Sequence, residues 1–349
     1  MSRQKILLAR TDRLGDVILS TPVATALKKK HAEVHVTFLA RRYTAEILRC
    51  HPHVDEIIEL DGAEIAGDSR RLLAVLRQKK FDAAIMLYPQ PQLAWAIRRS
   101  GIPLRLGTGY RWYSFLFNRR VFEHRKNAAY HEAEYNLRLL QPLGIAGAAI
   151  EFHFALSPTE RERIDAKLNA LGASDRPVIL HPGSGGSARD WPPENFARLA
   201  DLLSQALGAQ VILTGAPHEV ELINGILQQT TTKPISLCGR LSITELAVLC
   251  QRAAVFVSNS TGPLHLAVMV GAPVVAFYPP ILACRPERWG PYGRRTDVLM
   301  SQQEECTHCR AANTRVCDCM RAIAVETALQ KIREKLSENQ RRHLNVAPQ

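Results

Sequence analysis

Four short polar stretches each follow an apolar segment that predicts a buried strand. They are RTDRLGDVILSTP (10–22), HPGSGGSARDWPPENF (181–196), TGAPHEVEL (214–222) and SNSTGPLHL (258–266). Ligands of doubly wound α/β sheets bind outside the carboxyl ends of the strands, where such loops lead into helices. These four loops are therefore the candidate site.

The first loop carries a carboxylate, Asp16, at or near the start of the next helix. One interpretation is helix capping, because Asp is a favourable N-cap and the helix dipole stabilises a negative charge. The other is a catalytic carboxylate at the mouth of a cleft. A second carboxylate, Asp12, is expected to form a salt bridge with Arg10 or Arg13.

The second and fourth loops have the composition of anion sites. Residues 183–187 are GSGGS, in which Ser184 and Gly185 allow backbone N–H groups to approach an anion, and Arg189 adds a fixed positive charge. In the fourth loop Ser260, Thr261 and Gly262 precede a proline that suits the first helical position, so the N-terminus of the helix is expected to hold phosphate. Neither loop is a Walker motif or a dinucleotide fingerprint.

Two further residues of these loops leave alternatives open. Glu219 lies where a nucleoside ribose or base would be met, but a simple helix start also explains an acid there. His265 lies one turn into the predicted helix, where a packed, locally bonded histidine is favoured over a catalytic one.

The alternation of apolar segments predicts two α/β units. Strands at 5–10 and 33–40 enclose a helix at 16–30, and the strand–helix rhythm restarts after the glycine-containing stretch 144–158. We therefore expect two doubly wound parallel sheets, with domains at 1–150 and 151–325. Residues 326–349 are expected to form a C-terminal helix and tail that packs back on the N-terminal domain.

The formal net charge of +12 predicts an anionic partner. Eight basic residues lie between Arg98 and Lys126, where the single acid is Glu123. The aromatic residues Trp112, Tyr113, Phe115 and Phe117 are interleaved with them. A solvated loop explains this run as well as a binding surface does, and no nucleic-acid-binding signature accompanies it. A cytoplasmic location is expected, since no segment reaches the roughly 20 apolar residues of a spanning helix and the N-terminal apolar run is too short for a signal peptide.

Four cysteines crowd into CTHCRAANTRVCDC as Cys306, Cys309, Cys317 and Cys319. A CxxC followed by a CxC is compatible with a structural zinc site, although the usual second CxxC is missing. The alternative is a loop of reduced thiols, because disulfides are disfavoured in the cytosol.

In their order and spacing these motifs resemble glycosyltransferase family 9, the heptosyltransferases of the lipopolysaccharide inner core. The resemblance also includes RWYSFLFN, HEAEYNLRLLQPLG and CMRAIAVETAL. It implies a GT-B architecture, two Rossmann-like domains facing a central cleft, with the acceptor bound by the first domain and a nucleotide sugar, typically ADP-heptose, by the second. Metal-independent inverting transfer is implied, with no required cofactor.

By motif match, the resemblance makes Asp16 the general base and Arg189 the cation that neutralises the leaving diphosphate. It implies donor binding by Ser184, Gly185, Arg189, Glu219, Ser260, Thr261, Gly262 and His265. It implies acceptor binding, to an anionic glycolipid at the inner face of the cytoplasmic membrane, by Arg13, Arg111, Arg119 and Arg120, with no nucleic-acid partner.

Two departures from the family pattern leave the donor sugar open. Ser260 stands where many heptosyltransferases have an aspartate that contacts the sugar, and Arg189 stands where lysine is usual. The alternatives are a sugar-nucleotide epimerase or hydrolase on the same scaffold, which requires further acid–base groups, and a basic nucleic-acid-binding protein, which does not explain two phosphate loops.

Overall fold

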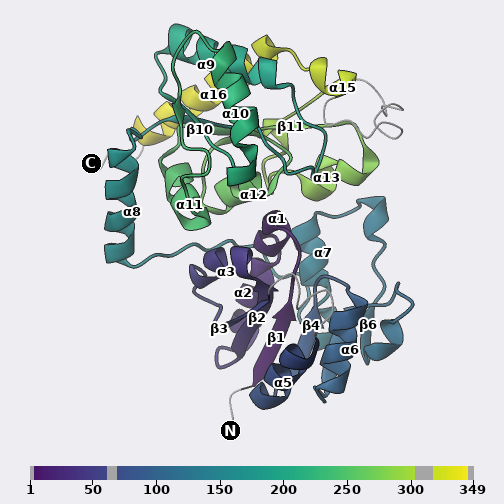
Figure 1. Ribbon diagram of the computed structural model, residues 1–349. Coiled ribbons are helices and arrows are strands. Elements are labelled where there is room, and N and C mark those ends of the chain that lie inside the picture. The colour runs from purple at the N-terminus through teal and green to yellow at the C-terminus, as the bar shows by residue number, and fades with distance from the viewer. Residues whose placement is uncertain (1–3, 61–68, 303–316, 345–349) are drawn as a thin grey trace. The chain divides into compact units, whose positions relative to one another are not determined.

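The computed structural model describes residues 4–60, 69–302 and 317–344 (Figure 1). The chain divides into two compact units, unit 1 (Met1–Ala155) and unit 2 (Leu156–Gln349). The division falls inside the stretch 144–158. It lies five residues after the domain end predicted at residue 150.

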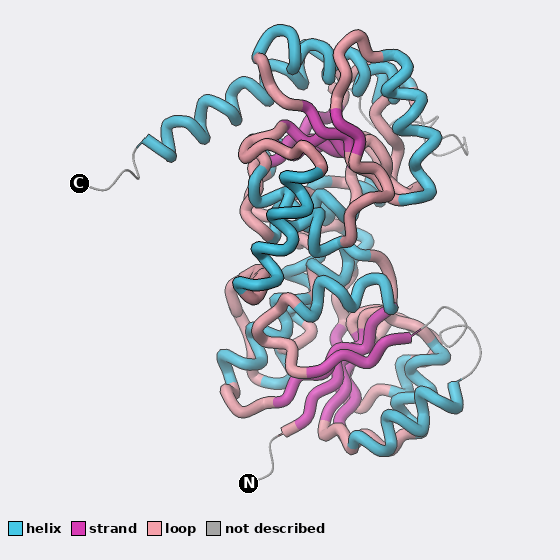
Figure 2. Tube along the Cα trace, turned by 60° about the vertical axis from the view of Figure 1, so that its left-hand side comes forward, coloured by secondary structure: helices cyan, strands magenta, loops and turns pink. Residues whose placement is uncertain are grey.

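Unit 1 is built on a parallel sheet of six strands in the order β3-β2-β1-β4-β5-β6. Alternate residues of β1 pack into different cores: Leu8 belongs to one apolar cluster and Leu7 to another. Both faces of the sheet are therefore covered by helices, as parallel sheets require (Figure 2). The strands are β1 (Lys5–Ala9), β2 (His35–Arg41), β3 (Glu56–Leu60), β4 (Ala83–Met86), β5 (Leu104–Thr108) and β6 (Arg119–Val121).

The helices of unit 1 connect its successive strands, except the last helix, which follows the last strand, β6. They are α1 (Leu14–Ile18), α2 (Thr21–Lys30), α3 (Arg42–Arg49), α5 (Ser69–Lys79), α6 (Pro91–Arg99) and α7 (Glu132–Arg138), with 3-10 turns η1 (Ser114–Leu116), η2 (Arg125–Asn127) and η3 (Gln141–Leu143).

The prediction of a single helix at 16–30 is wrong, because this segment forms two helices, α1 and α2. Pro22 has no N–H to donate to the carbonyl of Ile18, four residues earlier. The Thr21 hydroxyl takes that place and donates to the Ile18 carbonyl at 2.8 Å. Asp16 is consequently held on a short helix of five residues, in its first turn, and the N-cap is Arg13 rather than Asp16.

Unit 2 repeats the same topology with six parallel strands in the order β12-β11-β10-β7-β8-β9. In chain order within each unit, both sheets have the 3-2-1-4-5-6 arrangement of dinucleotide-binding folds. The two doubly wound sheets predicted from the sequence are confirmed. The strands are β7 (Val178–His181), β8 (Val211–Leu213), β9 (Ile235–Ser236), β10 (Val255–Asn259), β11 (Val274–Tyr278) and β12 (Val298–Met300).

Helices also surround the second sheet. They are α8 (Pro158–Ala170), α9 (Pro193–Leu207), α10 (Val220–Gln229), α11 (Ile243–Arg252), α12 (Gly262–Met269), α13 (Pro286–Trp289), α15 (Asp318–Arg321) and α16 (Val325–Leu344), with 3-10 turns η4 (Pro217–Glu219), η5 (Leu282–Cys284) and η6 (Arg295–Asp297). In the described part of the chain, no helix is long and apolar enough to cross a bilayer.

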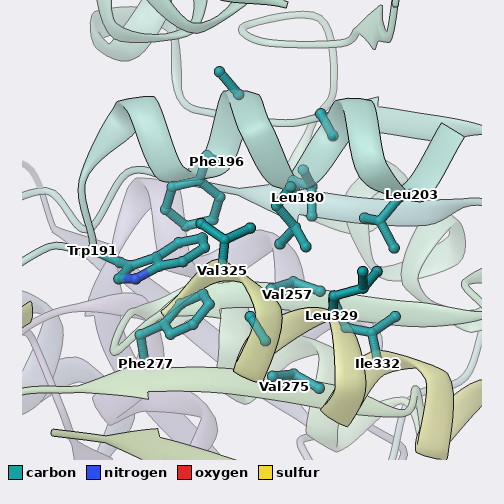
Figure 3. Close-up of a cluster of buried hydrophobic side chains, with 14 of the residues drawn as sticks. Leu180, Trp191, Phe196, Leu203, Val257, Val275, Phe277, Val325, Leu329 and Ile332 are labelled. Atoms are coloured by element: carbon teal, nitrogen blue, oxygen red, sulfur yellow. The ribbon is translucent and has the colours of Figure 1, made fainter. Parts of the chain in front are cut away.

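The C-terminal helix α16 packs on unit 2. Val325, Leu329 and Ile332 enter the same core as Phe196 of α9 and Phe277 of β11 (Figure 3). This packing continues as far as Leu336, and the expected contact of residues 326–349 with the N-terminal domain stays a prediction. An apolar stripe indicates that a helix is packed, but it does not identify the surface that receives it.

Three histidines cluster where the end of unit 1 returns to α3. The ring centroids of His51, His53 and His153 lie 4.9–5.6 Å apart. Burial is the largest of the causes that lower the pKa of His51, to about 3, and the neighbouring rings lower it further. In the described residues, no group of three or more His, Cys, Asp or Glu side chains is placed to hold a metal ion.

We expect this cluster to make unit 1 sensitive to acid. His51 is neutral in the folded state, so its stabilising contribution is fully present above its unfolded pKa of about 6.5 and is lost as the pH falls toward 3. Between pH 7 and pH 5 the loss is about 2 kcal/mol. Chemical denaturation of wild type and His51→Gln at both pH values measures it, and the variant should lose about 2 kcal/mol less. Equal losses in the two proteins would contradict the prediction.

Candidate active site

The loop after β1 is organised by a buried arginine, Arg10, whose side chain is 3% exposed. Its Nε lies 2.8 Å from Asp12 Oδ1, and one terminal nitrogen lies 2.6 Å from Asp16 Oδ1. The other terminal nitrogen donates to the carbonyl of Leu87, which follows β4. Loops after β1 and β4 meet because the order of the strands reverses between them, and this is the position where such sheets bind ligands.

Helix α7 completes this arrangement with two residues that sequence reasoning did not assign. Asn136 Oδ1 accepts from Arg10 at 3.4 Å, and its amide nitrogen donates to the Leu19 carbonyl at 3.0 Å. Glu132 lies 3.5 Å from Arg10 and also pairs with Arg125. Their i, i+4 spacing was the available signal, because it places both on one face of the helix.

Asp12 and Asp16, the two carboxylates of this loop, are in different environments. Burial raises the pKa of Asp12 to about 6, although the charge of Arg10 opposes that change. Burial would lower the pKa of Arg10, but the charges of Asp12, Asp16 and Glu132 outweigh it and raise the value. Arg10 therefore stays protonated and holds Asp16, whose side chain is 19% exposed, at the edge of solvent. This is the geometry of a positioned carboxylate that a substrate can reach.

The four arginines predicted for the acceptor lie at two places in unit 1. Arg13 and Arg111 are exposed and follow the carboxyl ends of β1 and β5, the same edge of the sheet as Asp16. Arg119 and Arg120 are exposed on the edge strand β6, three strands away from β1 in the sheet order. The structure thus places two of them on the edge that carries Asp16.

In unit 2 the loop after β7 forms a turn that only glycine adopts easily. Gly185 and Gly186 have φ values of +57° and +76°, in the left-handed region. The Gly186 N–H donates to Ser184 Oγ at 3.2 Å. Ser187 Oγ lies 2.6 Å from the carbonyl of Ser260, which ties this turn to the loop after β10. These loops meet at the strand-order reversal of unit 2, between β7 and β10.

Two buried residues anchor the segment that carries Arg189. Trp191 is 1% exposed and stacks on Phe277, with ring centroids 4.1 Å apart (Figure 3). The side chain of Asn259, the last residue of β10, accepts a hydrogen bond from the backbone N–H of Trp191 at 2.8 Å. It donates one to the Pro182 carbonyl at 2.6 Å. Arg189 lies two residues before the anchored Trp191 and is half-buried. Its positive charge acts on the Cys284 thiol and partly offsets the rise of that pKa caused by burial.

Replacement of Trp191 should remove its packing against Phe277 in the core of unit 2. We expect Trp191→Ala to lower the free energy of unfolding of unit 2 by about 3–5 kcal/mol, because the large buried ring leaves a cavity. Chemical denaturation measures the effect. The matched control is Trp112→Ala, since Trp112 is 74% exposed and its removal should change stability little. A loss no larger than that of the control would contradict the packing described above.

The fourth loop leads into α12, whose N-cap is Thr261 and whose first residue is Gly262. Ser260 and Thr261 are buried, and the Ser260 hydroxyl hydrogen-bonds Tyr278. Within the described part of the chain no side chain caps this N-terminus, so its first backbone N–H groups are available to a ligand. His265 is buried in the helix, in agreement with the packed histidine favoured from the sequence.

Glu219 acts as a capping acid at the start of a helical turn, and its contact with a nucleoside stays a prediction. It ends the 3-10 turn η4 and is not in the first turn of α10, which begins at Val220. Its Oε2 accepts from the Ala216 N–H at 2.8 Å, as a capping acid does. Its Oε1 lies against Gly183, where a Cβ atom would be 1.9 Å away, so the carboxylate also reaches the loop after β7. Burial lowers the pKa of the neighbouring His181 to about 4, although the negative charge of Glu219 raises it.

The cysteine cluster is only partly within the described residues. Cys306 and Cys309 lie outside them. Cys319 is fully buried in the apolar core of unit 2, and Cys317 is half-buried against the same core. The zinc site therefore stays a prediction, and its CxC half lies beside the core rather than in an open loop.

Together these residues can do two kinds of chemistry. Unit 2 offers a glycine turn, an arginine and a helix N-terminus, the donors that stabilise a diphosphate. Unit 1 offers a positioned carboxylate that can accept a proton.

The comparisons with known proteins agree with this chemistry. Lipopolysaccharide heptosyltransferase 3 of Escherichia coli is 26% identical over 273 residues, 76% of this chain and 80% of the relative. Lipopolysaccharide heptosyltransferase 2 of Escherichia coli (strain K12) is 28% identical over 291 residues, 79% of this chain and 83% of the relative. The structure of E. coli ADP-heptose lps heptosyltransferase II has the same fold, with a TM-score of 0.80 and 24% identity over 97% of this chain and 100% of that one. It confirms the GT-B fold class.

The sequence model of glycosyltransferase family 9 (heptosyltransferase) matches residues 69–319. That range includes α7, the glycine turn, Arg189, Glu219 and the start of α12. The protein is a glycosyltransferase, and it belongs to glycosyltransferase family 9, the heptosyltransferases.

Proposed function

We propose that this enzyme transfers a heptose from ADP-heptose to an acceptor of the lipopolysaccharide inner core, with inversion at the anomeric carbon and without a metal ion. The observation that carries the proposal is the Ser187–Ser260 bond, because it ties together the two loops that we assign to the diphosphate. The relatives are named as lipopolysaccharide heptosyltransferases, and one matched structure is named as an ADP-heptose enzyme.

In the proposed reaction Asp16 accepts the proton of the acceptor hydroxyl. The acceptor oxygen forms a bond to the anomeric carbon while the bond from that carbon to the diphosphate breaks. Negative charge then develops on the leaving ADP. Arg189 and the N–H groups of Thr261 and Gly262 stabilise it, which is the task that a cation performs in metal-dependent transfer.

The donor and the acceptor are assigned to different units. We assign the diphosphate to the turn at Ser184 and Gly185, the ribose to Glu219, and the sugar to Ser260. We assign the anionic groups of the acceptor, a glycolipid at the inner face of the cytoplasmic membrane, to the arginines of unit 1. Their guanidinium groups suit phosphate because they bind it in a bidentate manner. Arg13 and Arg111 are the first candidates, because they lie on the sheet edge that carries Asp16.

An epimerase or hydrolase requires additional acid–base groups in the donor half. The two candidates there are already engaged: Glu219 caps η4, and His265 is buried in α12. Transfer is therefore the better supported reaction.

A thermal-shift panel of ADP-, UDP- and GDP-sugars tests the proposal on wild type and Asp16→Ala. ADP-sugars should stabilise both proteins, by about 3 kcal/mol at a hundredfold excess over the dissociation constant. Stabilisation by UDP- or GDP-sugars instead would overturn the ADP assignment, and stabilisation by none of them would overturn the nucleotide-sugar assignment.

A further inference from the structure

Unit 1 exposes large aromatic side chains of the kind that hydrophobic cores usually bury. Trp112 is 74% exposed, Phe122 61% and Phe115 59%, all on or just after the connection from β5 to β6. We call this set, with its ring neighbours, the aromatic surface. Its members are Trp95, Tyr110, Trp112, Phe115 and Phe122.

The aromatic surface is held in place by the fold. Phe115 contacts Trp95 of α6 edge-on, with centroids 6.0 Å apart, and Tyr110 contacts Phe122 at 5.5 Å. Ser114 Oγ donates to the Thr108 carbonyl at 2.7 Å, and the neighbouring Tyr113 is buried. The loop is therefore fixed from inside while its largest apolar rings point to solvent.

Exposed cations accompany these rings. Arg99 lies over the Trp95 ring, 5.7 Å from its centroid. The segment's only acid, Glu123, pairs with Arg138 of α7. Six exposed basic residues of the segment form no ion pair with any carboxylate in the described parts of the chain: Arg98, Arg99, Arg111, Arg119, Arg120 and Lys126.

This combination matches the interface of a bilayer. Trp, Tyr and Phe rings are favoured at the level of the headgroups, and arginines attract anionic lipids. Each edge-to-face pair covers one ring face, which leaves fewer faces for the stacked bases of single-stranded nucleic acid.

We propose that the aromatic surface inserts into the headgroup region of an anionic lipid bilayer and anchors unit 1 there. Its use in the cell rests on the proposed function, because it would bring the enzyme to a membrane-bound glycolipid acceptor. The binding itself does not depend on the reaction.

Sedimentation with phosphatidylcholine vesicles containing phosphatidylglycerol tests the proposal. Wild type should bind these vesicles. The triple variant Trp112→Ser, Phe115→Ser, Phe122→Ser should bind at least roughly tenfold more weakly, because it lacks the three aromatic side chains that the bilayer would bury. The control is Met300→Ser, which removes an exposed apolar side chain of unit 2 and should bind like wild type. The single variant Trp112→Ser, which should fold normally, should show a smaller loss in the same direction.

Insertion has its own readout, which electrostatic adhesion does not share. Lipids brominated on their acyl chains should quench tryptophan fluorescence of wild type. Trp112→Phe should reduce that quenching while it still binds, and the quenching that remains should come from Trp95 of the same surface. Failure to bind anionic vesicles, unchanged binding by the triple variant, or preference for single-stranded DNA at the same salt concentration would overturn the proposal. Vesicle binding without heptosyl transfer would leave the anchor standing and count against the proposed function alone.

Discussion

Asp16→Asn should reduce kcat by about 10²–10⁴-fold, because a positioned general base contributes that much to proton transfer. Asparagine has nearly the same shape and its amide oxygen can still accept from Arg10, which lies 2.6 Å from Asp16 Oδ1. The variant should therefore fold and bind the nucleotide sugar like wild type. Steady-state kinetics and nucleotide thermal shifts measure the two effects separately.

Asp12→Asn is the matched control. It alters a carboxylate on the same arginine, 2.8 Å from Arg10 Nε, but one that is more buried. We expect a smaller loss of kcat than for Asp16→Asn. Turnover retained by Asp16→Asn would remove Asp16 as the base, and a larger loss in Asp12→Asn would transfer the assignment to Asp12.

Arg189→Gln should lower kcat by about 10²–10³-fold, the effect of removing one donor that stabilises developing charge. The reason is that Arg189 is assigned to the leaving diphosphate, whose charge increases in the transition state. Arg189→Lys should retain part of the activity, because the charge remains while the bidentate geometry is lost. Kinetics with ADP-heptose and an inner-core acceptor measure both variants.

An arginine outside the site supplies the comparison. Arg198 of α9 is exposed and pairs with Glu326, so Arg198→Gln should keep activity close to wild type. If Arg189→Gln behaved like Arg198→Gln, the diphosphate would have to be held by backbone groups alone.

The loops of the candidate site could be found from the sequence because their signals are local. A glycine turn, a proline after Thr-Gly and an acid after a buried strand each depend on neighbours within a few residues. The residues that hold these loops could not be found in this way. Asn259 bonds to Pro182 and Trp191, 77 and 68 positions away, and Asn136 bonds to Arg10, 126 positions away.

The basic segment between Arg98 and Lys126 illustrates the same limit for the fold. The sequence predicted no strand there, but β5 and the three-residue strand β6 lie within it. The edge strand β6 is paired on one side only, so charged residues are tolerated there and the apolar pattern is weak. Only pairing with β4 determines that this segment joins the sheet.

The sequence by itself determined two parallel α/β units and the loops at the ends of their strands, because hydrophobic period and turn chemistry are properties of neighbouring residues. Tertiary structure decided that α16 packs on unit 2 and that Pro22 divides the first helix so that Asp16 lies in a short one. It also decided that Arg10, one of the two partners predicted for Asp12, binds both Asp12 and Asp16. These outcomes depend on which distant surfaces meet and on how buried charges find partners, and local composition does not encode either.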